Sequence, residues 1–323
     1  MKLNGAVFIL ALPFASPALA EGFSISSPID CDLASDCYIQ QYVDSDPSPA
    51  ASDFTCSKLT YNGHKGTDFA LPNRSELARN VRVLASAAGR VKGVRDGMDD
   101  VSYSDDVADA VAGRECGNGI VIDHGNGWET QYCHMKKGSV IVKSGQQVLQ
   151  GQELGFVGQS GKAAFPHVHL SVRKDGKVID PFDPDGTTTC ATPGDSTLWQ
   201  DAPAYRAGGL IGAGFAQTVP TFDDIKSGTA DAQVLSSDAP ALVIWGYMFG
   251  SQANDIMTLS IFGPDGMVIA DDVTLTKTQA QSFRAIGKKR RGKDWTTGSY
   301  SGTVTVIRGP QILSQKTVQI EIE

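Results

Sequence analysis

Residues 118–134 read NGIVIDHGNGWETQYCH, and this stretch decides the class of fold. Apolar and polar residues alternate over 119–123 and again over 128–134, which is the two-residue period of a half-buried strand. Between the two runs stands HGNG at 124–127, and an Asn-Gly pair is a strong signal for a tight hairpin turn. The stretch therefore predicts two adjacent antiparallel strands.

The same alternation of apolar and polar residues continues on both sides of this hairpin, and hardly any segment there has the periodicity of an amphipathic helix. Short apolar alternations, broken by Gly, Asn and Asp, predict further strands. They lie at 81–85, 89–94, 139–142, 153–158 and 167–173. A second series lies at 241–247, 257–262, 273–277, 281–286, 302–308 and 317–322. Regular short strands of this kind predict a small Ig-like β-sandwich over 236–323. We therefore expect an all-β, antiparallel protein.

The composition agrees with this prediction and excludes several classes of protein. Of the 323 residues, 41% are hydrophobic, which is enough for one large domain or two modest ones. The formal charge is -8, so a general nucleic-acid binder is not expected. Every apolar run is shorter than the about 20 residues that span a membrane, so no membrane span is expected. The oligomeric state is left open.

Residues 1–20 have the three parts of a secretory signal peptide. Lys2 supplies the positive start, residues 6–14 the apolar middle, and Ala18 and Ala20 the small residues of a cleavage site. We expect cleavage after Ala20 and a periplasmic or secreted location. Such a location permits disulfides, so the even number of 6 cysteines predicts a set of bridges.

The expected bridges follow from the positions of these cysteines. One pair lies close together near the N-terminus, and a second pair flanks the central hairpin at roughly equal distances. The remaining two cysteines would join the two ends of one domain. The expected pairs are therefore Cys31–Cys37, Cys116–Cys133 and Cys56–Cys190.

After the signal peptide the chain divides by composition into four segments. Residues 21–55 are an irregular lead, and residues 56–190 are a β-rich domain. Residues 191–235 are rich in Gly, Ser, Thr, Ala and Pro, which is typical of a linker. Residues 236–323 are the sandwich.

Two charged segments leave alternatives open. Six aspartates lie between Asp96 and Asp109, and a solvated surface loop is favoured over a calcium loop because the spacing does not fit an EF-hand. The sandwich carries a basic cluster, Lys288–Lys293, beside Trp295. This domain is either a structural appendage or a binder of anionic envelope polymer.

All 5 histidines lie in the first β-rich domain. His167 and His169 are two residues apart in a predicted strand, so both point to one face. His64 and Asp68 are four residues apart and converge on one face if that segment is extended. Two imidazoles and one carboxylate suit zinc with one open coordination position.

The other histidines are interpreted from their strands. In regular alternation His134 shares a face with Tyr132, and Cys133 points the other way, which makes Cys133 a poor metal ligand. His134 is then free to move protons beside the metal. His124 stands at the hairpin turn, where a structural role is favoured.

Several of these segments, taken together, resemble the lysostaphin/LytM-type peptidases, zinc endopeptidases that cut the peptide part of peptidoglycan. The resemblance covers about residues 60–184, and its segments follow the family's order. They are GHKGTDF at 63–69, NGIVIDHG at 118–125, TQYCHM at 130–135, VLQGQELG at 148–155, GQSG at 158–161 and PHVHL at 166–170.

This resemblance implies the fold, the cofactor and the site. The fold would be the antiparallel duplicated hybrid motif with an open groove. One Zn²⁺ would be bound by His64, Asp68 and His169, and His134 and His167 would be catalytic. The partner and substrate would be peptidoglycan. Which of the two catalytic histidines is the general base stays open.

Some residues depart from the family's pattern, and several functions remain possible. Phe165, Val168, Leu170 and Ser171 replace other residue types, which affects the expected substrate fit more than zinc binding. The main alternatives are a catalytically inactive relative that binds peptidoglycan or activates a hydrolase, and a secreted peptidase for glycine-rich proteins. A carboxypeptidase or amidase on another zinc fold lacks its motifs here.

Overall fold

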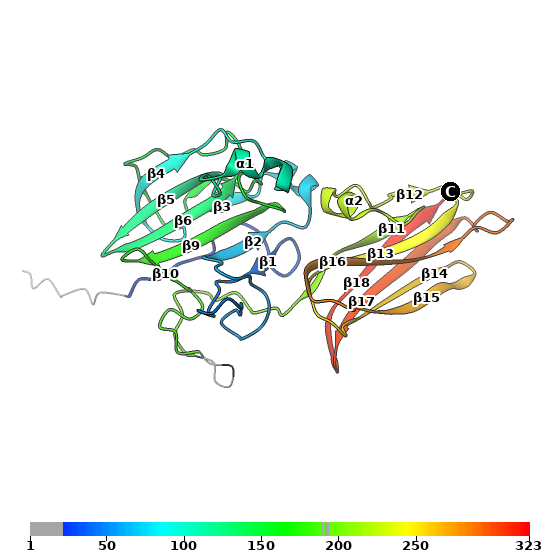
Figure 1. The fold of residues 1–323 in the computed structure, drawn as a ribbon. Helices are drawn as coiled ribbons and strands as arrows, with labels where there is room; N and C mark the ends of the chain where they lie inside the picture. Colours follow the sequence, from blue (N-terminus) through cyan, green and yellow to red (C-terminus); the bar gives the residue numbers. More distant parts are fainter. Residues whose placement is uncertain (1–21, 189, 191–193) are drawn as a thin grey trace, which may run out of the picture.

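The computed structural model describes residues 22–188, 190 and 194–323 (Figure 1). The expected signal peptide at 1–20 lies outside these residues. Within the described part, no helix has the length and apolar character needed to cross a membrane. The protein is built almost entirely from antiparallel strands, as predicted, and they form two β-rich units that lie side by side.

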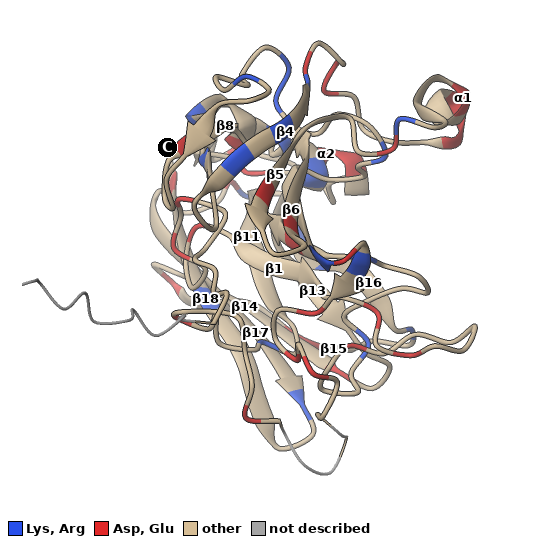
Figure 2. Cartoon of the chain, turned by 90° about the vertical axis from the view of Figure 1, so that its left-hand side faces the viewer, with Lys and Arg blue, Asp and Glu red and all other residues tan. Residues whose placement is uncertain are grey.

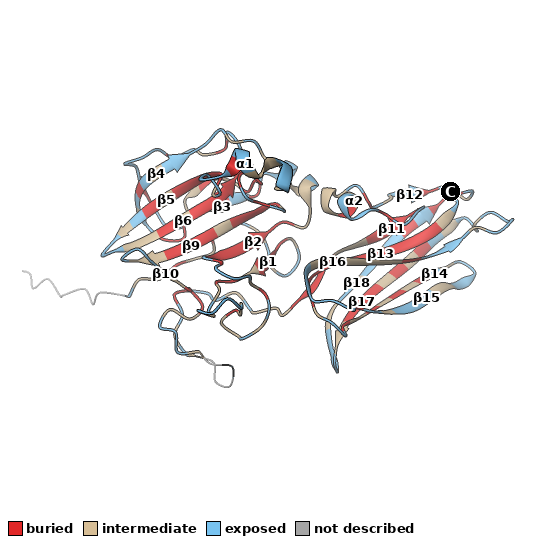
Figure 3. Cartoon of the chain, in the orientation of Figure 1, coloured by how far each residue is buried: buried red, intermediate tan, exposed pale blue. Residues whose placement is uncertain are grey.

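The first unit is built on one large antiparallel sheet. Its strands lie in the order β1 (Tyr38–Gln41), β2 (Thr67–Ala70), β9 (His167–Lys174), β6 (Trp128–Met135), β5 (Asn118–Gly125), β4 (Gly89–Arg95) and β7 (Gln147–Val148). β10 (Lys177–Ile179) also pairs with β9, and β3 (Arg82–Leu84) pairs with β8 (Glu153–Phe156) in a separate ribbon. Short helical turns lie at Arg74–Arg79, Asp105–Val107 and α1 (Ala108–Val111). The middle strands of the sheet are buried (Figure 3).

The central hairpin forms as predicted. β5 and β6 are joined at Gly125, Asn126 and Gly127, which all have positive φ (80°, 50° and 81°), the conformation that an Asn-Gly turn supplies. The prediction of a strand at 139–142 is wrong. The backbone N–H groups there do not pair with a neighbouring strand. Val140 donates to the Asp96 carboxylate and Ile141 to the Leu154 carbonyl.

The second unit is a sandwich of two sheets. One sheet contains β11 (Gly209–Ala216), β13 (Ala241–Ser251) and β16 (Gln279–Lys289). The other contains β12 (Val234–Leu235), β18 (Gln311–Ile322), β17 (Gly298–Arg308), β14 (Ile256–Gly263) and β15 (Gly266–Thr274). Apolar side chains from both sheets share one core. Its Ig-like character stays a prediction.

The segment 191–235, expected as a linker, contains strand β11, helix α2 (Phe222–Ser227) and strand β12. Its glycines suggested flexibility, but in β11 they make room for a neighbour. A Cβ on Gly214 would lie 2.6 Å from the Trp245 ring of β13. The strand expected at 273–277 is also displaced, because β15 ends at Thr274.

The two units are packed directly against each other through β1. The buried Gln40 amide donates to the Ala280 carbonyl at 2.9 Å, and the Gln281 amide bonds the Tyr38 hydroxyl at 3.1 Å. The Tyr38 ring lies 4.9 Å from that of Phe249. The lead therefore belongs to the junction between the units, and the apolar core of the first unit continues into the sandwich.

The two charged segments are tied into the structure. Asp96 accepts the backbone N–H of Gly138 at 2.7 Å, and Asp100 accepts those of Lys137 at 2.9 Å and Gln159 at 2.7 Å. Acidic residues also lie in and beside α1 in this loop (Figure 2). In the sandwich, the Trp295 indole is partly buried and donates to the Ala239 carbonyl at 3.0 Å, so its N–H is already used.

Three disulfides join the cysteines in the pairs that the sequence predicts. They are Cys31–Cys37, Cys56–Cys190 and Cys116–Cys133. The second bridge ties two residues that are 134 positions apart in the sequence. The third bridge lies at the end of the central hairpin.

A buried acid, Asp180, follows β10 directly. Its Oδ1 accepts the backbone N–H of Phe182 at 2.9 Å, while its Oδ2 has no hydrogen-bond partner among the described residues. Burial raises the pKa of Asp180 to about 7, and the nearby Asp183 and Asp53 add to the effect against the Phe182 hydrogen bond. The native protein therefore keeps a proton that the unfolded chain releases near pH 4.

We predict that Asp180→Asn stabilises the protein more at pH 8 than at pH 5. In the wild type, the free energy of unfolding falls as the pH rises from about 4 to 7, by at most about 4 kcal/mol from this group. The amide is neutral at both pH values and avoids that loss. Urea unfolding at both pH values measures the difference, and an equal effect at pH 5 and pH 8 would contradict the prediction.

Candidate metal centre

Strands β2 and β9 bring a carboxylate and an imidazole together. In their antiparallel register Asp68 lies opposite His169, and Ala70 lies opposite His167. The Asp68 Oδ1 and His169 Nδ1 atoms are 2.7 Å apart. His64 Nε2 lies 3.3 Å from the same Oδ1 and 3.2 Å from His169 Nδ1. These three residues form the one group in the described part of the chain that could hold a metal ion.

His64 and Asp68 converge as predicted, but the local backbone that brings them together is not the extended segment that we expected. His64 lies in a turn that follows Gly63, whose φ is +77°, and β2 begins only at Thr67. The turn, and not an extended spacing of four residues, swings the imidazole back over Asp68. The His64 side chain is nearly inaccessible, at 1% exposure.

Hydrogen bonds fix which ring nitrogen of each histidine carries the proton. His64 Nδ1 donates to the Tyr42 carbonyl at 2.6 Å, because a carbonyl can only accept. The Ser171 hydroxyl donates to the Lys65 carbonyl at 2.8 Å, so its oxygen accepts from His169 Nε2 at 3.0 Å. His64 Nε2 and His169 Nδ1 are therefore left with lone pairs.

When both rings are neutral, as metal ligands must be, three lone-pair donors thus converge with no hydrogen between them. Two imidazole nitrogens and one carboxylate oxygen, all acceptors, lie within 3.3 Å of one another. Such an arrangement repels itself unless a cation lies in the centre. The second contacts, to backbone carbonyls and a hydroxyl, are the kind that orients metal-bound histidines. The geometry therefore fits a metal ion.

The charge of the site is set by Asp68, which is 3% exposed. Burial alone raises the pKa of this carboxyl, but the imidazoles of His64 and His167 outweigh it and hold the pKa well below its usual range. Burial likewise opposes a charged His64, yet the charge and hydrogen bond of Asp68 raise the pKa of this imidazole. Asp68 is therefore an anion at neutral pH, as a carboxylate ligand would have to be.

His134 and His167 form a second pair beside these ligands. Their ring centroids are 4.6 Å apart, and His167 Nε2 lies 3.6 Å from Asp68 Oδ1. His134 Nδ1 donates to the Ser160 carbonyl, and His167 Nδ1 to the Phe165 carbonyl, both at 2.8 Å. Burial lowers the pKa of both imidazoles, so each is neutral with a lone pair on Nε2.

His134 reaches the site through a β-bulge, which corrects the expected alternation of β6. Ile120 pairs with Tyr132 and Asn118 with Met135, so Gly119 faces both Cys133 and His134. In addition, Cys133 lies opposite His169 and Tyr132 opposite Leu170.

Cys133 is therefore on the ligand face and Tyr132 on the core face, the reverse of our expectation. His134 joins the ligand face because the extra residue of the bulge, with φ at +63°, turns its side chain over. Cys133 is still no ligand, since it is bonded to Cys116.

His124 is not part of the site. Its ring is held at the hairpin end by the Ala88 carbonyl and the Thr130 hydroxyl, both at 2.8 Å. The Phe23 ring lies 5.2 Å from it. These contacts agree with the structural role expected from the sequence.

Sequence reasoning missed four contributors to the site, one of which is the Phe165 carbonyl that accepts from His167. Ser171 orients His169, whereas we expected it to affect substrate fit. Ser160 and Tyr42 orient His134 and His64 through their carbonyls. The position of Ser171, two residues after His169 on the same strand face, is a signal that could have identified it.

Comparisons with known proteins agree with this site. The profile described as Peptidase family M23 matches residues 62–181. Peptidoglycan DD-endopeptidase ShyA of Vibrio cholerae is 32% identical over 117 residues, which are 36% of this chain and 22% of that protein. DD-carboxypeptidase/endopeptidase Mpg of Neisseria meningitidis is 30% identical over 122 residues, which are 38% of this chain and 23% of that protein.

A crystal structure of a zinc containing peptidase from Vibrio cholerae is 25% identical and covers 44% of this chain and 38% of its own, with a TM-score of 0.29. This chain spans less than a quarter of the length of the two curated relatives. The segment matched by the family model includes all five residues of the two histidine groups described above. Residues 62–181 therefore match the model of Peptidase family M23, in agreement with the resemblance that the motifs indicated.

Proposed function

We propose that this chain is an exported, zinc-dependent endopeptidase that hydrolyses peptide bonds in the stem peptides or crossbridges of peptidoglycan. The observation that carries the proposal is the convergence of three lone-pair donors, from His64, Asp68 and His169, beside two neutral imidazoles. The relatives named as peptidoglycan DD-endopeptidases support the substrate class. Three disulfides suit an oxidising compartment outside the cytoplasm.

The donor set fits one zinc ion better than other common metals. Catalytic zinc sites take three protein ligands of nitrogen and carboxylate oxygen and leave a fourth position open. Calcium and magnesium prefer sets made only of oxygen. Two ligands at about 2.0 Å from a tetrahedral ion lie about 3.3 Å apart. His64 Nε2 lies 3.2 Å and 3.3 Å from the other two donor atoms, which agrees with this spacing, while Asp68 Oδ1 and His169 Nδ1 are closer to each other, at 2.7 Å.

The mechanism combines this centre with the two further imidazoles. A bound zinc ion would polarise the scissile carbonyl and make a water molecule more acidic. Nε2 of His134 or His167 takes the proton of that water, because Nδ1 of each ring is already donating to a carbonyl. The ring that has gained the proton then gives it to the leaving amine. Both rings are buried, which keeps bulk water away from the transferred proton.

The proposal is tested on isolated peptidoglycan. The zinc-loaded protein should release peptide-containing fragments from purified sacculi, and mass spectrometry of those fragments identifies the bond that is cut. Glycine-rich elastin-like peptides serve as the competing substrate. Zinc-loaded protein that cuts these peptides but no sacculi would replace the substrate class, and zinc-loaded protein that cuts neither would contradict an endopeptidase.

We predict that His169→Ala loses the metal and the activity together. The substitution leaves two of the three ligands, and the remaining pair holds zinc far more weakly. Zinc per chain, measured by plasma mass spectrometry after dialysis, checks the result. A variant that kept one zinc per chain would overturn the ligand assignment.

We predict that Ser171→Ala weakens zinc binding by about 10–100-fold without abolishing it. The change removes the acceptor of His169 Nε2 and so frees this ring to turn or to change its protonated nitrogen. Competition with a chromogenic chelator measures the zinc affinity. Ser139→Ala is the matched control, because the Ser139 hydroxyl is also buried and bonds the Lys136 carbonyl away from the ligands. Equal zinc affinities in the two variants would contradict the role of Ser171.

We predict that His134→Ala and His167→Ala keep zinc and fold but each lose about 10²–10⁴-fold in kcat. The two rings act on one transition state, so the double variant should be far less than multiplicatively worse. Turnover of sacculi and zinc content are measured in parallel. His124→Ala is the control, and its turnover should stay close to that of the wild type. A loss confined to His124→Ala would show that the hairpin has been assigned wrongly.

A further inference from the structure

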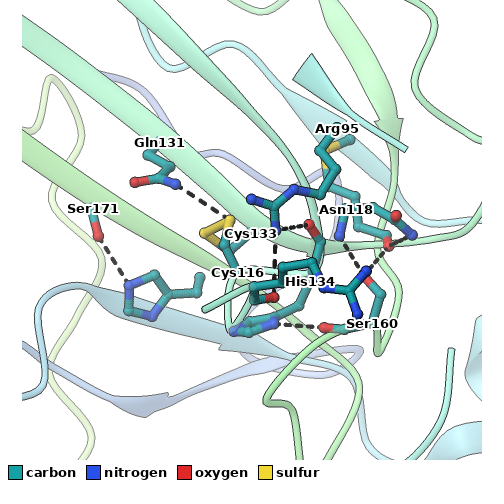
Figure 4. Close-up of a disulfide and its surroundings, with 12 residues drawn as sticks. Arg95, Cys116, Asn118, Gln131, Cys133, His134, Ser160 and Ser171 are labelled. Carbon is teal, nitrogen blue, oxygen red and sulfur yellow. Dashed lines mark hydrogen bonds between the residues drawn. A yellow bond between two sulfur atoms is a disulfide. The ribbon is translucent and has the colours of Figure 1, made fainter. Parts of the chain in front are cut away.

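The bulge that presents His134 is closed by a disulfide. Cys133, the residue before His134, is bonded to Cys116, which lies in the loop before β5 (Figure 4). The His134 backbone N–H also donates to the Cys116 carbonyl at 2.8 Å. Two consecutive residues of β6 are therefore anchored to one residue, the first by a covalent bond and the second by a hydrogen bond.

The conformation of His134 needs such an anchor. Its φ of +63° lies in the left-handed region, which is unfavourable for a non-glycine residue and persists only where the surroundings enforce it. Without the extra residue of the bulge, β6 would alternate regularly and His134 would point to the core face with Tyr132. The side chain reaches the metal ligands only while the bulge is held.

The loop that carries Cys116 is itself fixed. Gly117 has a φ of +64°, and a Cβ there would lie 2.4 Å from the Ser160 carbonyl carbon. The Arg95 guanidinium donates to the Gly117 carbonyl at 3.3 Å. Ser160 Oγ accepts the Asn118 N–H at 2.9 Å and donates to the Met135 carbonyl at 2.7 Å, so it ties the loop to the end of β6. The bridge therefore connects the bulge to a rigid support.

The close packing around the Cys116–Cys133 bridge also indicates that the bulge is held rigidly. A Cβ on Gly119 would lie 2.5 Å from the Tyr132 carbonyl oxygen and 2.8 Å from Cys116 Sγ. Glycine is thus the residue that allows the bulged strand and the bridge to approach β5 together. Cys116 is partly exposed while Cys133 is 5% exposed, so a small thiol reaches the bridge from the Cys116 side.

We propose that the Cys116–Cys133 bridge is a positioning element for catalysis, which holds the bulge that aims His134 at the metal centre, so that breaking the bridge lowers turnover while the metal stays bound. The inference rests on the role of His134 in the proposed function. Opening the bridge is an ordinary thiol–disulfide exchange. A dithiol attacks Cys116 Sγ and Cys133 leaves as a thiolate; the second thiol then releases Cys116, so the dithiol is oxidised by two electrons and both cysteines are reduced.

The test compares two pairs of substitutions. Cys116→Ser with Cys133→Ser removes the bridge, and Cys31→Ser with Cys37→Ser is the matched control, because that short bridge lies in the lead. We expect the first variant to keep one zinc per chain, with kcat reduced about 10–100-fold and KM little changed, since small misplacements of a reacting group have effects of this size. The control should keep its kcat.

Two further measurements separate positioning from general stability. In a His134→Ala background, removing the bridge should cost no further activity, because its effect passes through that residue. In zinc-free protein, diethylpyrocarbonate should modify His134 faster once the bridge is gone, as read by peptide mass spectrometry. A lower unfolding temperature with unchanged kcat and unchanged His134 reactivity would overturn the proposal.

Two remaining outcomes are also decisive. If His134→Ala is itself fully active, the proposed function has failed at His134, and the reactivity of this ring alone decides whether the bridge orders it. If the double serine variant does not fold, the folded wild type is reduced with dithiothreitol, desalted and reloaded with zinc. Loss of turnover with Cys116 and Cys133 reduced, and its return on reoxidation, is the expected result; full activity of that reduced form overturns the proposal.

Discussion

The register between β2 and β9 is the constraint on which the site depends. It places Asp68 directly opposite His169 and so fixes two of the three ligand atoms within 2.7 Å of each other. A shift of one residue in either strand would send one of them to the other face of the sheet. The buried face of the same strands, with Phe69 and Leu170 fully inaccessible, resists such a shift. The apolar core therefore also determines where these candidate metal ligands lie.

The sequence predicted the residues of the site better than the paths that bring them there. The period of two in a strand placed His167 and His169 together correctly, because it depends on one strand alone. The bulge at His134 depends on the pairing of β5 with β6, and a single sequence does not show where one strand gains a residue over its neighbour. Ser171 was misjudged for a similar reason, since its role depends on the Lys65 carbonyl, 106 residues away.

The second unit shows the same limit at the level of domains. Glycine-rich sequence at 209–216 suggested a linker, yet Gly214 lies against the Trp245 ring within a sheet. Gln40, in the lead, is fully buried at the junction with β16. The sequence predicted only an irregular lead there, because the Ala280 carbonyl that accepts the Gln40 hydrogen bond is 240 residues away. The sandwich is therefore packed on the strand that borders β2, so it supports the ligand strands from the side.

One device repeats throughout the site and links its structure to its chemistry. Each of the four site histidines is held by an outward hydrogen bond from one ring nitrogen, so the other nitrogen faces inward with a lone pair. The outward acceptors are the carbonyls of Tyr42, Ser160 and Phe165 and the hydroxyl of Ser171. A site lined in this way has acceptors but no imidazole donors. In the reaction proposed above, the proton that a leaving amine needs would then come from the attacking water, through His134 or His167.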